Sequence, residues 1–430
     1  MVDAPRRSLW RNGDFLKLWS GETVSQLGSQ VSILAIPLAA ISILHASNFA
    51  VGLLASAETV PFLLVGLPAG VWVDRWPRRP VLISGDVGRA LALGSVPLAY
   101  VLGWLTIWQL YVVALTSGVL TVFFDVASQS YLPGLVGRDH LIDGNAKLEI
   151  SQSAAQIGGP GLAGALIHLL QAPIAVTVDA ASFVVSAVAI GSIGGTETRP
   201  PAVGRGQRAM RSDIREGLRY VLGHPLLRRF AGATSTSNLF SSLFQTVLLL
   251  YMVHTLRYGA GTIGAVLLLG NVGVLLGALL ASPLGRRFGI GPVCCAAMVV
   301  AGSSSLLGPL ATRSNGFPLL VAAQFGMAAA GPIYNVNQVS FRQALCPERL
   351  LGRMNATMRF LVWGTLPVGA FAAGVLASTI GLRPALWVGA AGGCLAFLWL
   401  VTGPVRSVRH IPEPQLGQAA QDGGPAEVQL

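Results

Sequence analysis

The sequence contains few charged residues. Asp, Glu, Lys and Arg together occupy 11% of its 430 positions, against about a quarter in ordinary soluble domains, which is too little to cover the surface of a soluble globule. Apolar residues reach 53% of the chain. Its 52 glycines would weaken helices in water but are frequent in membrane helices, where small residues let backbones approach closely. The composition therefore indicates a protein that crosses a membrane several times.

Residue patterns typical of metal sites, disulfide frameworks and enzymes are also missing. The four cysteines fall in or beside apolar segments without metal-ligand spacing, so we expect them to pack rather than to bind metal. The sequence has neither the spacing of a catalytic triad nor a Gly-x-x-x-x-Gly-Lys loop for ATP. We therefore expect no enzyme activity, no cofactor, no metal site and no direct drive by ATP.

Apolar runs of about 20 residues, the length that crosses a bilayer, recur along the whole chain. We expect twelve membrane helices. The first run is too long for the core of a cleavable signal peptide, so we expect it to remain as the first helix. The expected helices cover residues 19–44, 50–73, 80–102, 106–127, 149–170 and 173–194, and then 230–254, 261–284, 291–311, 317–340, 356–380 and 384–403.

These runs fall into two bundles of six helices, which predicts an all-α membrane protein. A polar linker separates the bundles, and the end of the chain is rich in Gln, Gly and Pro, which is typical of disorder. The expected organisation is a cytoplasmic N-terminus at 1–18, a first bundle at 19–194, a linker at 195–229, a second bundle at 230–403 and a disordered cytoplasmic tail at 404–430.

The basic residues, which give a net charge of +11, lie mostly in short segments on one side of the expected helices. That side also holds both termini, whereas the opposite loops contain only Arg257, Arg313 and Arg383. Because cytoplasmic loops of membrane proteins are enriched in Lys and Arg, both termini are predicted to lie in the cytoplasm, with the chain in the inner membrane of the cell. This placement explains the charge without nucleic-acid binding.

The linker is rich in arginine and contains a helical pattern. Ile214, Leu218, Val221 and Leu222 recur at the spacing of one helix face, so we expect a basic amphipathic helix on the inner membrane surface. We favour a role as a tether between the bundles over a regulatory or partner-binding role.

The two bundles resemble each other at an offset of about 210 residues, as the internal repeats of membrane transporters do. Gly66 and Arg75 correspond to Gly277 and Arg286. A parallel repeat of six helices resembles the major facilitator architecture, in which the substrate binds near the middle of the membrane between the two halves.

The segment after the second expected helix resembles the loop signature of the major facilitator superfamily. Spaced glycines precede an Asp-Arg pair and two further arginines; small residues permit close helix crossing, and the charges can cluster at the cytoplasmic face. In that family the cluster latches the outward-facing state. The resemblance therefore implies a gate formed by Gly66, Gly70, Asp74, Arg75, Arg78 and Arg79. The second copy has Gly285 in place of the acid, which predicts a one-sided latch.

A second motif lies in the fifth expected helix. Gly159-Pro160 is followed by the small pair Ala163-Gly164, which resembles the exporter signature associated with antiporters of this superfamily. The proline lacks an N–H and so frees one backbone carbonyl, which permits a bend. The resemblance implies export, with Gly159, Pro160, Ala163 and Gly164 at a hinge.

Further segments, at 14–28, 86–90, 130–133 and 216–227, resemble the drug exporter branch that includes macrolide and enterobactin exporters. The resemblance implies a secondary active transporter. We expect proton-coupled efflux of a small organic amphipathic compound, such as a drug, an antibiotic or a siderophore, by alternating access. A major facilitator importer or a lipid flippase is the alternative.

Acidic residues within the expected membrane helices occur only in the first half, so a carboxyl group that carries protons must lie there. An acid in hydrocarbon is costly and is usually functional or paired. Glu58 and Asp179 have no basic partner nearby in the sequence and are the first candidates for proton coupling. The alternative, which the sequence favours equally, is that neighbouring hydroxyl groups satisfy these acids. Glu22 and Asp125 are further candidates near the inner gate.

The second half offers uncharged polar and aromatic residues in helices that would face a central cavity. Amides and aromatic rings can bind a bulky amphipathic ligand, although hydrogen bonds between helices would use the same groups. The candidate substrate contacts are Gln245, Tyr334, Asn335, Asn337, Gln338 and Trp363. The expected partners are the substrate, protons and the lipid bilayer, and we expect a monomer.

Overall fold

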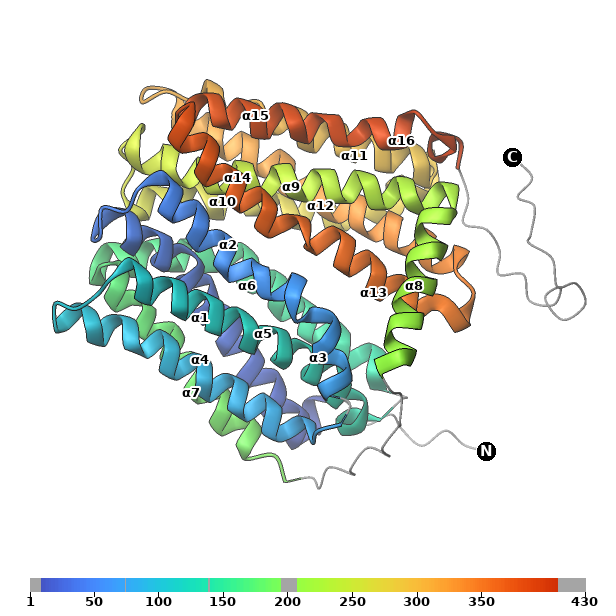
Figure 1. Ribbon diagram of the computed structural model, residues 1–430, viewed down its shortest axis with the longest axis horizontal. Helices are drawn as coiled ribbons and strands as arrows, with labels where there is room; N and C mark the ends of the chain where they lie inside the picture. Colours follow the sequence, from blue (N-terminus) through green and yellow to red (C-terminus); the bar gives the residue numbers. More distant parts are fainter. Residues whose placement is uncertain (1–8, 74, 138–139, 195–206, 409–430) are drawn as a thin grey trace, which may run out of the picture.

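The computed structural model describes residues 9–73, 75–137, 140–194 and 207–408. Every regular element in these ranges is helical. Figure 1 shows the helices side by side in two bundles, with the start of the first helix and the end of the last helix at the same end of the molecule, the end of the termini. The first part of the expected linker and the tail from residue 409 fall outside these ranges.

The first bundle contains six membrane crossings. The second of them is broken at Val65, so that two helices form it. The helices are α1 (Gly13–Ser42), α2 (Asn48–Leu64), α3 (Gly66–Val73), α4 (Arg78–Val101), α5 (Ile107–Val136), α6 (Leu141–Leu170) and α7 (Ala172–Gly191).

The second bundle repeats this order. Its fifth crossing is formed by two helices, as is its sixth. The helices are α9 (Pro225–His254), α10 (Ala260–Phe288), α11 (Ile290–Ser305), α12 (Gly316–Leu345), α13 (Glu348–Trp363), α14 (Thr365–Thr379), α15 (Leu382–Cys394) and α16 (Leu398–Val401).

Ten of these crossings are each long and apolar enough to span a membrane, among the residues that the structure describes. The other two are α2 with α3, where α2 alone has 17 residues, and α6, whose first turns are polar. The prediction of an all-α membrane protein with twelve transmembrane helices is thereby confirmed.

Helices α1, α6 and α13 start well before the apolar runs predict; α13 begins at Glu348 rather than at residue 356. Helix α1 begins at Gly13 rather than at residue 19, because the side chain of Asn12 accepts hydrogen bonds of 3.1 Å from the N–H groups of Asp14 and Phe15 and so caps the helix. Helix α6 begins at Leu141 rather than at residue 149, since its first turns carry polar side chains that face a cavity. Apolar runs mark the part of a helix in hydrocarbon, not its ends.

The two bundles are in close contact at the end of the molecule far from the termini. Helix α2 packs on α14, and α6 packs on α10. A Cβ on Gly52 would collide with the backbone of Gly374, and a Cβ on Gly264 would lie 2.8 Å from the Cα of Gly164. Such contacts leave no room for water, so the bundles are closed against each other at this end.

The buried apolar residues form one cluster shared by both bundles and two clusters that each lie in one bundle. One large cluster joins residues of both bundles, such as Leu38 of α1 and Leu248 of α9, toward the far end. At the end that carries the termini there are two separate clusters, one around Phe15 in the first bundle and one around Phe230 in the second. The described part of the molecule is therefore closed at the far end and divided at the end of the termini.

Helix α8 (Gln207–Gly223) runs across the molecule at the end near the termini (Figure 1). It packs on α13, where Glu216 forms an ion pair with Arg353. Val221 is buried, whereas Leu218 and Leu222 remain exposed. Only part of the apolar face of this helix is therefore covered by protein.

Candidate functional site

A cavity of about 840 Å³ lies against the first bundle. Residues of α1, α4, α5, α6 and α7 form most of its wall, and Arg359 and Trp363 of α13 reach it from the other bundle. Three acidic residues, Glu22, Asp125 and Glu149, line it. All three lie in the parts of their helices that are nearer to the termini, which places the cavity where the bundles are divided.

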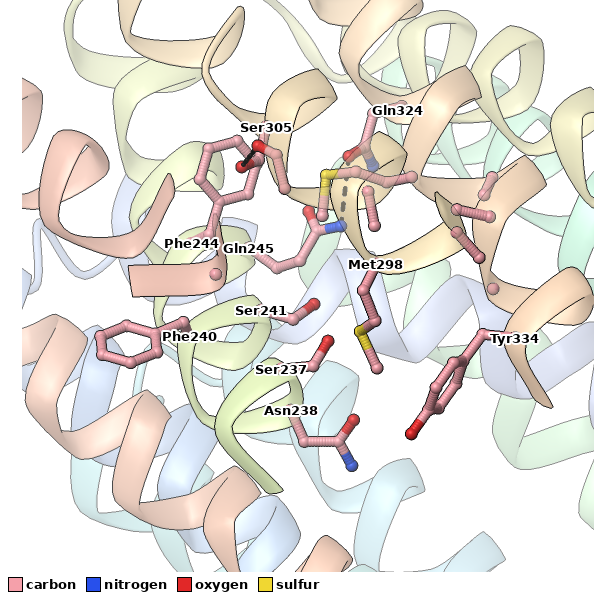
Figure 2. Close-up of a pocket in the computed structure, with 18 of the residues that line it drawn as sticks. Ser237, Asn238, Phe240, Ser241, Phe244, Gln245, Met298, Ser305, Gln324 and Tyr334 are labelled. Atoms are coloured by element: carbon pink, nitrogen blue, oxygen red, sulfur yellow. Dashed lines mark hydrogen bonds between the residues drawn. The ribbon is translucent and has the colours of Figure 1, made fainter. Parts of the chain in front are cut away.

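A second cavity of about 400 Å³ lies in the second bundle, between α9, α10, α11, α12 and α15. None of the residues that line it is charged. Gln156 of α6 lines both cavities, so the two adjoin. Figure 2 shows the polar side chains of this wall: Ser237, Asn238, Ser241, Gln245, Ser305, Gln324 and Tyr334.

The two cavities differ in their chemistry. A ligand that spans them meets charged groups in the first cavity, namely three carboxyl groups and the guanidinium groups of Arg89 and Arg359. On the side of the second it meets neutral amides, hydroxyls, the sulfur of Met298 and the rings of Phe240 and Phe244. Apolar surface with a few convergent polar groups is typical of sites for small organic molecules.

Glu22 and Asp125 have different neighbours in the first cavity. The carboxyl group of Glu22 accepts a hydrogen bond from the hydroxyl of Ser128. Asp125 shares a smaller cavity between the bundles with Arg359, whose guanidinium carbon lies 4.9 Å from the centre of the Trp363 ring. Both carboxyl groups lie at the wall of the first cavity.

Asp86 and Arg89 form a buried ion pair in α4, with 2.6 Å between Oδ1 and Nη2. The guanidinium carbon of Arg89 lies 4.4 Å from the ring centre of Phe124 and 4.1 Å from that of Phe183, which are cation–π distances. Arg89 also lines the first cavity, so the ion pair and the two rings hold its guanidinium in place at this wall.

The two first candidates for proton coupling are not among the residues that line these cavities. Asp179 is buried and accepts hydrogen bonds from the hydroxyls of Ser182 at 3.2 Å and Ser29 at 3.4 Å. Glu58 is exposed on α2. For Asp179 the structure matches the alternative that neighbouring hydroxyls satisfy the acid.

The exporter motif lies where α6 contacts its neighbours. Gly164 packs on Gly264 of α10, Gly159 packs on the side chain of Gln30 of α1, and Ala163 is fully buried. The motif thus permits the close approach of α6 to a helix in each bundle.

We expect the replacement Gly264→Ala to separate the bundles at this contact. The new Cβ would lie 2.7 Å from the carbonyl oxygen of Pro160 and 2.8 Å from the Cα of Gly164. Overpacking of this kind costs about 1–3 kcal/mol, so the closed state should become about five-fold rarer or more. Thermal unfolding should begin at a lower temperature, and transport should slow.

The matched control for this variant is Gly261→Ala, on the same helix. A Cβ there would lie 4.0 Å from its nearest neighbour, the Cβ of His168, and should cause no change. Equal unfolding temperatures and transport rates for the two variants would contradict the importance of the glycine contact.

The glycines of the expected gate are not packed in this conformation. A Cβ on Gly66 or Gly70 would have no described atom within 4 Å, so the tight helix crossing expected there is absent, because the bundles are divided at this end. Their second-half counterpart Gly277 does pack tightly, against the backbone of Ala329 in α12. Asp74 lies outside the described residues.

The arginines of the expected gate lie around the turn between α3 and α4. Arg75 is exposed in this turn, and Arg78 is the first residue of α4. Arg79 donates hydrogen bonds to the carbonyl groups of Ile190 at 3.2 Å and Gly191 at 2.5 Å, so it joins the start of α4 to the end of α7.

Three of the expected substrate contacts line the cavities. Gln245 and Tyr334 line the second cavity, and Trp363 lines the first. The amide of Gln245 donates a hydrogen bond of 3.2 Å to Gln324 (Figure 2). The hydroxyl of Tyr334 lies 2.7 Å from that of Thr234. These side chains are placed to contact a bound molecule.

The other three expected contacts do not line either cavity. Asn337 is buried and donates hydrogen bonds to the carbonyl groups of Ala281 at 2.9 Å and Ile333 at 2.8 Å, so it joins α12 to α10. Gln338 donates to the side chain of Asn335 at 3.1 Å. For these residues the alternative of hydrogen bonds within and between helices describes the structure better than substrate contact.

Sequence reasoning did not name several polar residues of the cavity walls as candidates, among them Gln156, Asn238, Asn271 and Gln324. Each lies in a long helix among other polar residues, and only the direction in which it points distinguishes it. Their resemblance to the wall-lining Gln245 in residue type was the one available signal.

A family model described as transmembrane secretion effector matches residues 7–421. The multidrug efflux pump Tap of Mycolicibacterium fortuitum is 27% identical over 390 residues, which cover 87% of this chain and 91% of Tap. Macrolide efflux protein A of Streptococcus pyogenes is 22% identical over 405 residues, which cover 92% of this chain and 97% of that protein.

Solved transporter structures share the fold. A bacterial homologue of the iron transporter ferroportin in its inward-facing state has a TM-score of 0.69 at 19% identity, covering 92% of this chain and 99% of that chain. For an outward-facing structure of such a homologue, also 19% identical, the TM-score is 0.57, with coverage of 90% and 98%.

Proposed function

We propose that this chain, which belongs to the transmembrane secretion effector family of the major facilitator superfamily, exports small organic amphipathic compounds in exchange for protons. The observation that carries the proposal is the pair of adjoining cavities on the divided side of a molecule whose far end is closed. A central site open to one side only is what alternating access requires. Tap and macrolide efflux protein A are efflux proteins, and this similarity supports export as the direction of transport.

The conformation fits an inward-facing state if the termini lie in the cytoplasm, as the positions of Lys and Arg predict. The higher TM-score with the inward-facing ferroportin homologue supports this assignment. In the opposite state the bundles would close at the cytoplasmic end, where the unpacked glycines Gly66 and Gly70 leave room for α13. The gate of Asp74, Arg75, Arg78 and Arg79 would form there.

An amphipathic compound would bind with its parts divided between the two walls. The amides and hydroxyls of the second bundle can hydrogen-bond to neutral polar groups of the compound, and the nearby rings and Met298 can pack on its apolar part. The charged wall of the first cavity, with carboxyl groups and the guanidinium of Arg89, would face the rest of the compound. Release would follow when the bundles separate at the far end.

Proton coupling is assigned to Glu22 and Asp125 in preference to Glu58 and Asp179. The first two line the cavity that substrate and water enter, whereas Asp179 is satisfied by serine hydroxyls. A protonated carboxyl is neutral, and a neutral group is less costly at the middle of the membrane than a charged one. If substrate binding displaces the protons, each change between the two states carries either substrate or protons but not both. Substrate and protons then cross the membrane in opposite directions, which is antiport.

The expected result in membrane vesicles tests the direction and the coupling. Inverted vesicles that contain the protein should accumulate a labelled macrolide when their interior is acidic, and a protonophore should stop this accumulation. An untargeted comparison of the compounds retained by cells with and without the protein would identify further candidate substrates for this assay.

Two other outcomes would replace the proposal. Accumulation by right-side-out vesicles with an acidic exterior would indicate an importer. Movement of labelled lipids between leaflets, without any export of soluble compounds, would indicate a flippase.

A further inference from the structure

Pro160 leaves one backbone carbonyl of α6 without its usual donor. In an α-helix the carbonyl of residue i accepts a hydrogen bond from the N–H of residue i+4. The carbonyl of Gln156 would be bonded by residue 160, but proline has no N–H. An unsatisfied backbone group in the membrane costs free energy, so the carbonyl of Gln156 needs another donor.

The second bundle supplies this donor. The side-chain amide of Asn271, on α10, donates a hydrogen bond of 2.7 Å to the carbonyl oxygen of Gln156. Asn271 lines the second cavity and Gln156 lines both. The bond therefore joins the two bundles where the cavities meet.

This bond belongs to a series of contacts between α6 and α10. The series starts near the far end of the molecule and runs toward the cavities. Its members are Gly164 with Gly264, Gly161 with Leu268, and Gln156 with Asn271. The hydrogen bond thus joins α6 to α10 beside the second cavity. The glycine contacts, which lie nearer to the far end, allow the two helices to be close enough for this bond to form.

The equivalent contact between α2 and α14 is built differently. Ser56 donates a hydrogen bond of 3.0 Å to the carbonyl of Pro367 across the bundles. That carbonyl also has a donor in its own helix, because Phe371 lies four residues further along α14 and has an N–H. The repeat position of Pro160 is Ala370. Of the two acceptors, the carbonyl of Gln156 depends on the other bundle for its donor, whereas the carbonyl of Pro367 does not.

We propose that Asn271 is the positioning residue through which the exporter motif holds the far end closed. It replaces, in the closed state alone, the hydrogen bond that Pro160 removes from α6. When the bundles separate, the carbonyl of Gln156 loses its donor, which favours the closed state. A substrate in the second cavity that accepts a hydrogen bond from Asn271 weakens this contact and so favours opening. This role of Asn271 rests on the proposed function, because it assumes that the bundles alternate between two states.

A double-mutant cycle between Asn271 and Pro160 tests the proposal. Asn271→Ala should lower the ratio of far-end-closed to far-end-open molecules about five-fold, since it removes a hydrogen bond made only in the closed state, and such a bond contributes about 1 kcal/mol. Pro160→Ala restores an N–H in α6, so the carbonyl no longer needs Asn271. In the Pro160→Ala background, Asn271→Ala should therefore change the ratio less than about two-fold.

The ratio can be measured from distances between spin labels in purified protein. Suitable sites are Gly134→Cys on α5, where a side chain has room, and Gln343→Cys, exposed on α12, in a protein whose native cysteines are replaced by alanine. Both sites lie near the divided end, one in each bundle, and approach each other when that end closes. Asn271→Leu, which keeps a side chain of similar size but has no donor, should reproduce the effect of Asn271→Ala.

Ser56→Ala is the matched control, because its acceptor keeps a helical donor, and it should change the ratio less than about two-fold. An equal effect of Asn271→Ala with and without Pro160, or no effect of either Asn271 variant, would overturn the proposal. The distance measurement uses neither substrate nor a proton gradient. A failure to find an exported compound would therefore count against the proposed function and not against this role of Asn271.

Discussion

Replacing Asp125 with asparagine, or Glu22 with glutamine, is expected to reduce transport driven by a pH gradient to the background level. Both carboxyl groups line the first cavity. The described bundle helices of the second half contain one acid, Glu348, which is the first residue of α13 and precedes the apolar span Leu350–Thr379, so it is not placed to replace them. Exchange of substrate across the membrane without a pH gradient should continue, because binding and the movement of the bundles need no net transfer of protons. Parallel assays of gradient-driven uptake and substrate exchange in inverted vesicles would separate the two effects.

The control for these variants is an acid at the surface. Asp143→Asn removes an exposed ion pair with Lys147, and surface pairs contribute little, so both assays should give normal rates. Loss of gradient-driven uptake in Glu58→Gln or Asp179→Asn, with normal uptake in the Asp125 and Glu22 variants, would show that the coupling site lies away from the cavity wall.

The largest effect on stability is expected from Arg89→Met. This change leaves the carboxylate of Asp86 buried and without its partner, and breaking a buried ion pair in this way costs about 3–5 kcal/mol. It also removes the guanidinium between the rings of Phe124 and Phe183. The purified protein should unfold at a markedly lower temperature, and less of it should be recovered in monodisperse form.

A second substitution should reverse most of this loss. In the double variant Asp86→Leu with Arg89→Met no buried charge remains, and replacement of a buried pair by apolar residues of similar size is often neutral or stabilising. If the double variant were no more stable than Arg89→Met alone, the loss would have to come from the aromatic contacts rather than from the unpaired acid.

The fold could be predicted from the sequence because each crossing leaves a local signal. An apolar run of membrane length has to be a helix, since no other single segment satisfies its own backbone in lipid. The ends of α1 and α6 were predicted less well. A cap such as Asn12 and the polar turns after Leu141 extend these helices beyond hydrocarbon, where hydropathy carries no information.

The candidate site could be predicted only in part, because it depends on which way a side chain points. Gln245 and Asn337 are both amides in apolar helices, yet one lines a cavity and the other joins α12 to α10. The rotation of each helix about its axis decides between these roles, and it is set by packing against helices distant in the sequence. For the same reason the freed carbonyl of Gln156 was predictable from Pro160, but its donor Asn271 was not.

The shared apolar cluster at the far end has a thermodynamic consequence for the transport cycle. Opening that end would separate residues such as Leu38 and Leu248 from their neighbours and let water reach apolar surface that is now dry. Exposure of apolar surface to water raises the heat capacity, which makes both the enthalpy and the entropy of a transition depend on temperature. Unless closure of the two smaller clusters compensates fully, the free-energy difference between the state closed at the far end and the state open there depends non-linearly on temperature. The resting population of the carrier is then a property of the temperature at which the cell lives.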